Sequence, residues 1–306
     1  MINTICLDGN FSTTRLLTQE KPQIINTPED KFETVLFLPE GENRKGEGGL
    51  RTKGYFKKSY DDKPLISIIT VVFNGEKYLE ETIQSVINQT YSNVEYIIID
   101  GGSTDGTLDI IKKYEDKIDY WVSEKDEGIS DGFNKGIKLS KGKILGIINS
   151  DDEYIKNIFE TISDIFKEKD IDYLYGDMIL EDEEGNIIKE IKPDLKSKSI
   201  YGGMPFGHPT LFIKRKLYDK YGYFNNNYKI AMDFELYTRI YKKKSYYLSK
   251  NIAKYKRGGV SDINYLLGHK EVLAATLACK DSNFFRSLFE YFYRISRTFI
   301  RKILEG

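Results

Sequence analysis

The sequence predicts an α/β protein with a doubly wound, mostly parallel central sheet. Two patterns carry this prediction. Short apolar, β-branched runs alternate along the chain with amphipathic stretches of helical period, which is typical of βαβ units. Most of these apolar runs are followed at once by glycine and by acidic or amide side chains. Ligand-binding sheets place such residues beyond the carboxyl ends of their parallel strands.

The regular pattern begins near residue 64. Residues 66–73 form a continuous apolar run, as expected for a strand that is buried on both faces. Apolar positions then recur at helical spacing over 79–87. Further strands are expected at 94–99, 119–122, 143–148 and 171–175, and further helices near 104–114, 131–139 and 155–167.

After residue 175 the pattern changes, and a smaller mixed region is expected beside the parallel strands. The runs 178–180 and 187–191 flank turn-forming residues, which is a hairpin signal. Residues 208–213 are expected to form another strand. Helices are expected near Lys216 and over 232–243.

Residues 1–63 lack this regularity. The polar, glycine-rich segment 41–49 has no periodicity and lacks the spacing of a phosphate-binding loop. We expect a polar, loosely ordered extension over 1–63 with one short strand at 34–38. A main domain at 64–260 and a C-terminal helical region at 261–306 would follow.

The C-terminal region predicts an amphipathic helix with a basic polar side. Its apolar arc holds Phe285, Leu288, Phe289, Phe292, Phe299 and Ile303, and the opposite side holds Arg286, Arg294, Arg297 and Arg301. Two interpretations stay open. The helix lies on an anionic membrane surface, or it packs onto its own domain or onto a second copy of the chain.

Composition narrows the function classes. Hydrophobic residues make up 40% of the 306 and charged residues 30%, and the net charge of −1 gives no reason to expect a nucleic-acid partner. Cys6 and Cys279 are too far apart in sequence for metal-ligand spacing, so free thiols are expected. Without a secretory signal or a membrane-spanning apolar stretch, a cytoplasmic location is expected, with peripheral binding to the inner membrane face as an option.

Four polar motifs follow strands of the expected parallel sheet, at 74–75, 100–106, 123–128 and 149–152. Each alone is compatible with an ordinary turn, because Gly, Asn, Asp and Ser form turns and cap helices. Four motifs at one sheet edge together predict a ligand site.

Each motif has a chemical use. Asp100, directly after a buried strand, can accept a hydrogen bond from a base or a ribose hydroxyl, and Gly101 and Gly102 let a ligand approach the backbone closely. The adjacent carboxylates of Asp151 and Asp152 can bind a hard divalent cation together with phosphate oxygens. The alternative for this pair is the N-terminal cap of a helix.

The motifs at 66–74, 100–105 and 149–152 resemble, in this order, those of family-2 glycosyltransferases with the GT-A fold. The resemblance covers about residues 64–260. It implies a nucleotide-diphosphate sugar donor with UDP as the first expectation, a Mg²⁺ or Mn²⁺ ion, and inversion at the anomeric carbon. It also implies a glycan or lipid-linked sugar acceptor in surface polysaccharide synthesis.

The resemblance also implies roles for single residues. The donor would be bound by Thr70, Asn74, Asp100, Gly102, Ser103, Asp131, Asn134 and Asp151, and the metal by Asp152. Asp131 and Asn134 belong to a segment, 128–136, that is similar to the stretch that closes over the donor. Many members have arginine or alanine in place of Asp131, whereas a polysaccharide-synthesis subgroup has aspartate.

An inverting transfer needs a base that takes the proton of the acceptor hydroxyl. Residues 231–239 resemble the acidic helix start of the family, so Asp233 is the expected base and Glu235 the second choice. The alternative is a capped helix in which Asp233 pairs with Arg239. His208 faces either the acceptor or solvent, and His269 is expected to be structural.

Processive members carry a Gln-x-x-Arg-Trp motif that is missing here, so transfer of a single sugar is expected. Two other functions are less well supported. A sugar nucleotidyltransferase needs a glycine-rich loop with Arg and Lys after its first strand, and residues 73–77 do not supply one. A non-catalytic nucleotide-sugar binding protein would be favoured by loss of Asp152 or Asp233, but both are present.

Overall fold

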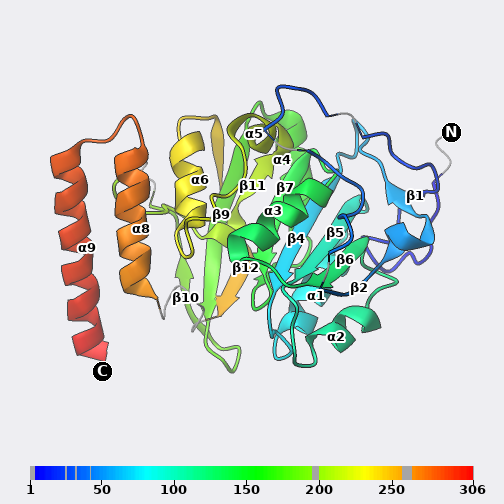
Figure 1. Cartoon of the computed structure of the whole chain (residues 1–306), viewed down its shortest axis with the longest axis horizontal. Coiled ribbons are helices and arrows are strands. Elements are labelled where there is room, and N and C mark those ends of the chain that lie inside the picture. The colour runs from blue at the N-terminus through cyan, green and yellow to red at the C-terminus, as the bar shows by residue number, and fades with distance from the viewer. Residues whose placement is uncertain are drawn as a thin grey trace.

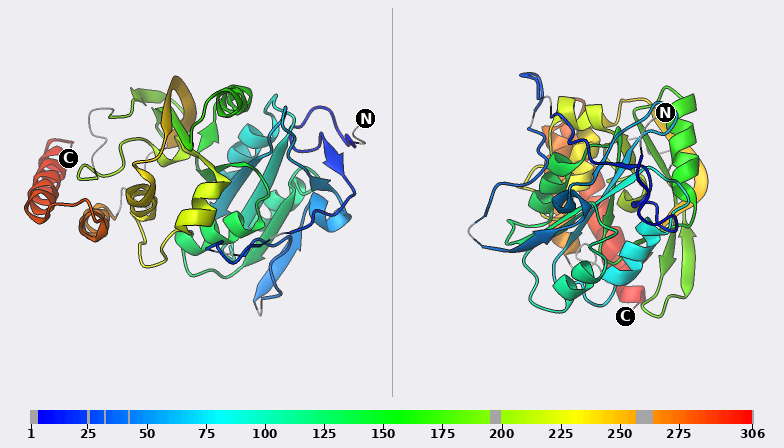
Figure 2. Two further views of the ribbon diagram at one scale, coloured as in Figure 1. Left: turned by 90° about the horizontal axis from the view of Figure 1, so that it is seen from above. Right: turned by 90° about the vertical axis from the view of Figure 1, so that its right-hand side faces the viewer.

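The computed structural model describes residues 4–24, 26–31, 33–41, 43–194, 200–256 and 264–305, and for 301–305 the backbone only. A ten-stranded sheet forms the centre of the molecule, and helices cover both of its faces (Figures 1 and 2). The predicted α/β class with a large, mostly parallel central sheet is confirmed.

Four parallel strands form the core of the sheet. They are β4 (Ile66–Val72), β5 (Val94–Asp100), β6 (Tyr120–Glu124) and β7 (Ile144–Asn149). Their spatial order is β6-β5-β4-β7. Each lies within two residues of its predicted position, because a strand buried on both faces gives an apolar run that is easily recognised in sequence.

The other strands extend this core on both sides. On one side β2 (Arg44–Gly48) pairs antiparallel with β6. On the other side follow β11 (Phe212–Lys214), β9 (Tyr173–Glu181), β12 (Ser245–Lys256) and β8 (Glu153–Tyr154). The predicted hairpin is present, since β10 (Ile187–Ile191) pairs antiparallel with β9. A separate pair is formed by β1 (Leu17–Thr18) and β3 (Phe56–Lys57).

The helices belong to two apolar cores on opposite faces of the sheet. One core holds α1 (Leu79–Ile87), α2 (Thr107–Lys113) and α4 (Ile158–Glu168), and the other holds α3 (Ile129–Leu139), α5 (Arg215–Tyr221) and α6 (Met232–Ile240). Helix α8 (Tyr265–Ala278) adds Val272 and Ala275 to the second core, and α9 (Phe284–Glu305) packs on α8 at the far end of the molecule (Figure 1).

Helix α3 lies unusually close to β4. A Cβ atom at Gly132 would stand 2.6 Å from Cγ1 of Val71, and one at Gly136 would stand 2.3 Å from Cγ2 of Ile69. Larger side chains at these two positions would push the helix away from the strand. The glycines therefore set the distance between the sheet and the helix that borders the cleft described below.

The prediction for the N-terminal segment is wrong in two respects. Residues 34–38 form no strand; Val35, Phe37 and Leu38 instead pack as irregular chain over part of the sheet. The segment 41–49, expected to be loosely ordered, contains β2. Its pairing with β6 uses backbone groups, and its glycines make room for a ring, because a Cβ atom at Gly48 would lie 2.7 Å from Nε1 of Trp121. A strand held in this way needs no apolar alternation.

Two further elements differ from expectation. Residues 208–213 do not form one strand: a 3-10 helix at His208–Thr210 with Pro209 in its first turn precedes β11. Strand β12 was missed because its sequence lacks an alternating apolar pattern. The domain boundary at residue 63 stays a prediction, although β2 lies N-terminal to it and joins the main sheet. The boundary at 260 lies outside the described residues.

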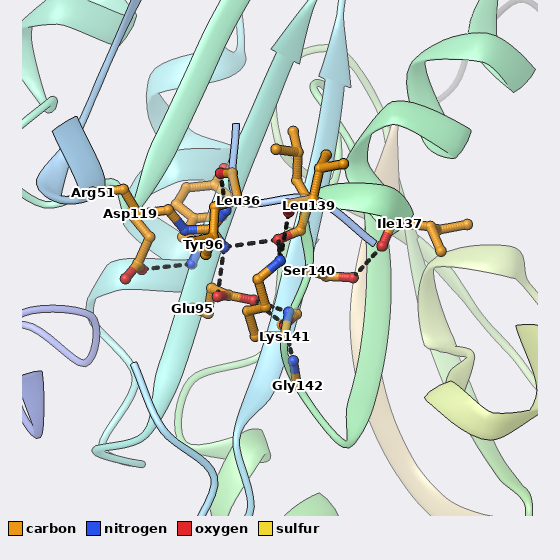
Figure 3. A network of polar contacts seen from close by, with 12 residues as sticks. Leu36, Arg51, Glu95, Tyr96, Asp119, Ile137, Leu139, Ser140, Lys141 and Gly142 are labelled. Atoms are coloured by element: carbon orange, nitrogen blue, oxygen red, sulfur yellow. Dashed lines mark hydrogen bonds and ion pairs between the residues drawn. The ribbon is translucent and has the colours of Figure 1, made fainter. Parts of the chain in front are cut away.

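A buried ion pair fastens the N-terminal segment to the sheet (Figure 3). Nη2 of Arg51 lies 2.6 Å from Oε1 of Glu95, and the side chains are 2% and 1% exposed. The guanidinium also donates to the carbonyls of Leu36 and Leu139, at 3.1 and 2.9 Å. Burial opposes the charged form of Glu95, but the adjacent Arg51 and Lys141 bring its pKa below the usual value.

Replacing Arg51 with Met should lower the free energy of unfolding by about 3–5 kcal/mol, because the buried carboxylate of Glu95 loses its partner. Urea unfolding followed by circular dichroism measures this. The double variant Arg51→Met/Glu95→Gln should recover part of the loss. Lys53→Met is the matched control: it removes an exposed pair with Glu115 from the same helical turn and should change stability by less than about 1 kcal/mol. Equal effects of Arg51→Met and Lys53→Met would contradict the structural role of the buried pair.

Candidate functional site

A cleft of about 850 Å³ opens at the carboxyl ends of β4 and β7. The chain steps outward from β4 to β5 and β6 with α1 and α2 on one face. It then returns through α3 on the opposite face to β7, so the direction of strand order reverses between β4 and β7. Such a reversal leaves a crevice at the strand ends where ligands bind in open α/β sheets.

Five stretches of chain form most of the cleft lining, which Lys77, Tyr78, Met178 and Tyr255 complete. The five stretches are the end of β4 with residues 71–75, the turn after β7 with residues 149–151, the start of α3, the 206–209 segment, and the loop and first turn of α6 with residues 229–233. The first two carry the predicted strand-end motifs. The last two come from the mixed second half of the chain, so the site joins both halves.

The two adjacent aspartates occupy different depths. Asp151 lines the cleft, whereas Asp152 is 1% exposed. Oδ2 of Asp152 accepts a hydrogen bond of 3.0 Å from the amide of Asn149, and Oδ1 has no hydrogen-bond partner among the described residues. Helix α4 begins at Ile158 with Asn157 as its cap, so the alternative that the aspartate pair caps this helix is wrong.

The electrostatics of this pair suit a cation. Burial raises the pKa of Asp151, and burial together with the charge of Asp151 raises the pKa of Asp152 well above its usual value. A divalent ion would relieve the repulsion and would give the bare Oδ1 an interaction. No cluster of three or more His, Cys, Asp or Glu side chains suited to a metal occurs in the described part of the chain. An ion here would therefore complete its shell with water or ligand oxygens.

Asn74 and Asp100 organise the turns beside the aspartates. Asn74 lines the cleft with a left-handed backbone (φ 53°), and its Oδ1 accepts a 2.8 Å hydrogen bond from the backbone of Thr104. Asp100 is fully buried; its carboxylate accepts hydrogen bonds from the backbone of Ser103 at 3.1 Å and from the hydroxyl of Ser123 at 2.5 Å. Asp100 thus shapes the turn rather than lining the cleft. The carbonyl of Gly102 accepts a 2.8 Å hydrogen bond from Lys45 of β2.

Other predicted donor residues are engaged within the protein. Thr70 is fully buried, with its hydroxyl 3.1 Å from that of Tyr96. Asp131 forms an ion pair of 3.3 Å with Lys135. The amide of Asn134 donates to the carbonyl of Phe224 at 2.9 Å and accepts from the backbone N–H of the same residue at 3.0 Å.

None of these three lines the cleft. Asn134 ties α3 to the 224 loop through these hydrogen bonds, and its role toward the donor stays a prediction. The motif at 128–136 does place the start of α3 at the cleft, but its polar side chains at 131 and 134 do not line the cleft.

The expected base lies where the sequence placed it. Asp233 is in the first turn of α6 and lines the cleft together with His208 of the neighbouring 3-10 helix. Burial raises the pKa of Asp233, and the charge of His208 acts in the opposite direction. Arg239 pairs with Glu235 at 2.8 Å, so the alternative of an Asp233–Arg239 pair is wrong, and Glu235 is already engaged.

Sequence reasoning missed three charged residues of the cleft, Lys77, Asp126 and Lys229. Lys77 lies in the turn before α1 and forms an exposed ion pair with Glu183. Asp126 lies just before α3, and burial raises its pKa. A Cβ atom at Gly101 would stand 2.7 Å from its carboxylate, so that glycine makes room for Asp126 as well as for a ligand. Lys229 lines the cleft from the loop before α6. Asp126 belongs to a recognised motif and could have been found, whereas no sequence pattern marks Lys229.

The loop that carries Lys229 is held from α8. The carboxylate of Glu271, 9% exposed, accepts hydrogen bonds of 2.8 Å from each of the backbone N–H groups of Lys229, Ile230 and Ala231. These groups lie at the start of α6, directly before Asp233. The C-terminal helical region therefore supports the part of the cleft that holds the expected base.

Replacing Glu271 with Ala should lower the free energy of unfolding by about 1–3 kcal/mol, because three N–H groups at the start of α6 lose their acceptor. Chemical denaturation measures the change. Lys270→Ala removes the exposed neighbour on the same helix and should change stability by no more than about 0.5 kcal/mol. The supporting role is refuted if Glu271→Ala is as stable as this control.

Comparison with known proteins identifies the family and agrees with the fold. Residues 67–233 match glycosyl transferase family 2, and the chain belongs to this family. A glycosyltransferase of Rickettsia prowazekii, described as uncharacterized, is 34% identical over 200 residues, which is 62% of each chain. Glycosyltransferase GlyG of Streptococcus pneumoniae is 34% identical over 126 residues, 40% of this chain and 42% of its own length. The matches thus span less than two thirds of these relatives.

Solved structures share the fold at lower identity. S. aureus TarS 1–349 in complex with UDP-GlcNAc has a TM-score of 0.57 and 22% identity over 73% of this chain and 69% of its own. The mannosyltransferase PcManGT of Pyrobaculum calidifontis, in complex with GDP-Man and Mn²⁺, has a TM-score of 0.55 and 15% identity over 72% and 66%.

Proposed function

We propose that this protein transfers a single sugar, with inversion, from a nucleotide-diphosphate sugar to a hydroxyl group of a glycan or lipid-linked acceptor. The observation that carries the proposal is one cleft with two kinds of carboxylate. Asp151 with Asp152 stands at the end of β7, and Asp233 stands in the first turn of α6 beside His208. Asp151 and Asp152 could bind a divalent cation together with the diphosphate of the donor, and Asp233 could accept a proton from the acceptor hydroxyl.

A nucleotide-sugar donor is supported by the neighbours of the same fold, which are complexes with UDP-GlcNAc and with GDP-Man. A UDP-linked donor is our first choice. Asn74 and Asp126, which line the cleft, are proposed to contact the nucleotide. The turn that contains Asp100, Gly102 and Ser103 would position the backbone next to the nucleotide. Thr70 and Asp131 would support the residues that contact the nucleotide, without contacting it themselves.

The aspartate pair fits a Mg²⁺ or Mn²⁺ ion. The sequence assigned the ion to Asp152; we propose that Asp151 binds it directly, because Asp151 lines the cleft while Asp152 lies buried behind it. The orphaned Oδ1 of Asp152 would add negative charge beneath the ion, or would become a ligand after a small shift. Such an ion, when bound, neutralises the charge that develops on the leaving diphosphate.

Replacing Asp151 with Asn should weaken Mn²⁺-dependent binding of UDP by at least about tenfold, because a charged ligand of the ion is lost. Isothermal titration with and without Mn²⁺ measures the effect. Asp152→Asn should weaken binding less. Asp109→Asn on the exposed side of α2 matches the charge change away from the cleft and should bind as the wild type does. If Asp151→Asn binds UDP with wild-type affinity, Asp151 is not a ligand of the ion. If Asp152→Asn loses more affinity than Asp151→Asn, Asp152 is the main ligand.

Asp233 is proposed as the general base. The acceptor oxygen forms a bond to the anomeric carbon while the bond from that carbon to the diphosphate oxygen breaks, and the electron pair leaves with the diphosphate. The acceptor proton passes to the carboxylate of Asp233. Attack opposite the leaving group inverts the anomeric centre. The raised pKa of Asp233 makes its carboxylate a better proton acceptor.

Replacing Asp233 with Asn should reduce turnover by at least about 10² while donor affinity is unchanged, because only the proton acceptor is lost. The wild-type enzyme should lose activity as the pH falls through the raised pKa of Asp233, because the base becomes protonated. In His208→Gln this acid limb should move slightly to higher pH, because protonated His208 lowers the pKa of Asp233. The shift is small because burial lowers the pKa of His208 itself and so reduces its positive charge.

Both effects are measured as kcat against pH with a UDP-sugar and a glycan acceptor. Glu235→Gln is the control on the same helix: it breaks the ion pair between Glu235 and Arg239 but leaves Asp233 in place, so it should retain most of the turnover. Near wild-type turnover of Asp233→Asn would place the base elsewhere.

A role in surface polysaccharide synthesis is supported by a relative. The Bacillus subtilis protein TuaG, whose provisional name assigns it to teichuronic acid biosynthesis, is 38% identical over 102 residues, 32% of this chain and 40% of its own. We therefore propose the same broad role here, in the cytoplasm.

A further inference from the structure

Helix α9 packs on α8 through its polar side. Nη2 of Arg294 lies 3.2 Å from Nδ1 of His269 on α8, and the hydroxyl of Thr298 lies 3.1 Å from Nε2 of the same ring. Ser287, on the same side of α9, is 3% exposed. Arg294, predicted to lie on a solvent-facing basic side, is thus turned inward, and His269 has the structural role that the sequence suggested.

The apolar side of α9 faces outward. Large side chains along it are exposed: Phe284 56%, Phe285 80%, Phe289 68%, Phe292 61%, Tyr293 54%, Phe299 60% and Ile300 57%. We call these seven residues the apolar stripe. The helix thus packs on its own chain through α8, as one of the two interpretations expected, while these apolar residues stay exposed among the described residues. A continuous exposed stripe of this kind marks a binding surface, because water contact with apolar area is unfavourable.

Charge favours an anionic partner for the stripe. Arg286 and Arg297 are exposed on its flank, and neither forms an ion pair with another described residue. The guanidinium of Arg286 lies over the ring of Tyr201, 4.4 Å from its centre. Among the described side chains of α9, Glu290 is the only acidic one. A two-fold antiparallel pair of α9 helices would bring the arginine flank of one copy against the same flank of the other. That arrangement is disfavoured by like-charge repulsion.

The geometry points to a lipid surface, and we propose that α9 binds anionic membranes by lying in the plane of the interface with its apolar stripe inserted. The helix has 22 residues and is about 33 Å long. Within the described ranges, no helix combines the length and hydropathy that crossing a bilayer requires. Aromatic side chains on one side and arginines on the flank are the composition of interfacial helices. This inference does not depend on the transfer reaction.

Co-sedimentation of the full chain with vesicles tests the proposal. The protein should bind phosphatidylcholine vesicles that contain about one third phosphatidylglycerol, and it should bind pure phosphatidylcholine far more weakly. Phe289→Ser/Phe292→Ser should lower the partition coefficient at least about tenfold, because two inserted rings are lost. Arg286→Gln/Arg297→Gln should lower it about fivefold per arginine, and only on the anionic vesicles.

The matched control is Lys112→Gln/Lys250→Gln, which removes the same charge from exposed positions on α2 and β12 and should bind as the wild type does. Thermal unfolding checks that each variant is folded. Light scattering after size-exclusion chromatography tests the alternative, that the apolar stripe binds a second copy of the chain. A wild-type dimer that becomes monomeric in Phe289→Ser/Phe292→Ser, without vesicle binding by either protein, would overturn the membrane proposal in favour of a second copy. Equal binding by the wild type and the phenylalanine variant would also overturn it.

Discussion

The reversal of strand order between β4 and β7 is the constraint on which the site depends. The chain continues from β4 towards β5 on one side of the sheet and from β7 towards β9 on the other, so the loops after the two strands diverge and a crevice remains between their carboxyl ends. Here the crevice receives Asn74 from one strand and Asn149 and Asp151 from the other. The close approach of α3 to β4, made possible by Gly132 and Gly136, sets one boundary of the same crevice.

Placing carboxylates in a crevice has an energetic consequence. Asp126, Asp151, Asp152 and Asp233 all have raised pKa values, and burial is the first cause in each case. The protein has little to gain in stability from this arrangement, because burial outweighs the nearby positive charges, such as that of Lys256 for Asp151 and Asp152, and none of the four carboxylates forms an ion pair with another described residue. A ligand that brings a divalent cation, or a reaction that moves a proton, makes use of that unsatisfied charge. Functional sites commonly concentrate such perturbed groups.

The two ends of the chain support this arrangement through buried carboxylates. At the N-terminal side, Glu95 receives Arg51 and so holds the segment that covers the sheet beside β6. At the C-terminal side, Glu271 receives three backbone N–H groups directly before Asp233. Neither carboxylate lines the cleft. Glu95 holds the N-terminal segment against the sheet, and Glu271 holds the backbone that leads to Asp233.

The sequence by itself determined the parallel core, the four helices that follow its strands, the hairpin and the family, because these depend on local periodicity and on motifs that sit at strand ends. It also placed Asn74, Asp151 and Asp233, which line one cleft.

Tertiary structure decided what local patterns do not encode. Strand β2 forms because β6 has a free edge and Trp121 needs glycines against it. Asp152 lies behind Asp151, and Asn134 binds a distant loop rather than the cleft. Lys229 enters the cleft because Glu271, 42 residues later, holds its backbone. The amphipathic helix was visible in sequence, but only the packing of its polar side on α8 decided that its apolar stripe faces outward. Contacts between residues far apart in the chain decide burial and access, and no local pattern records them.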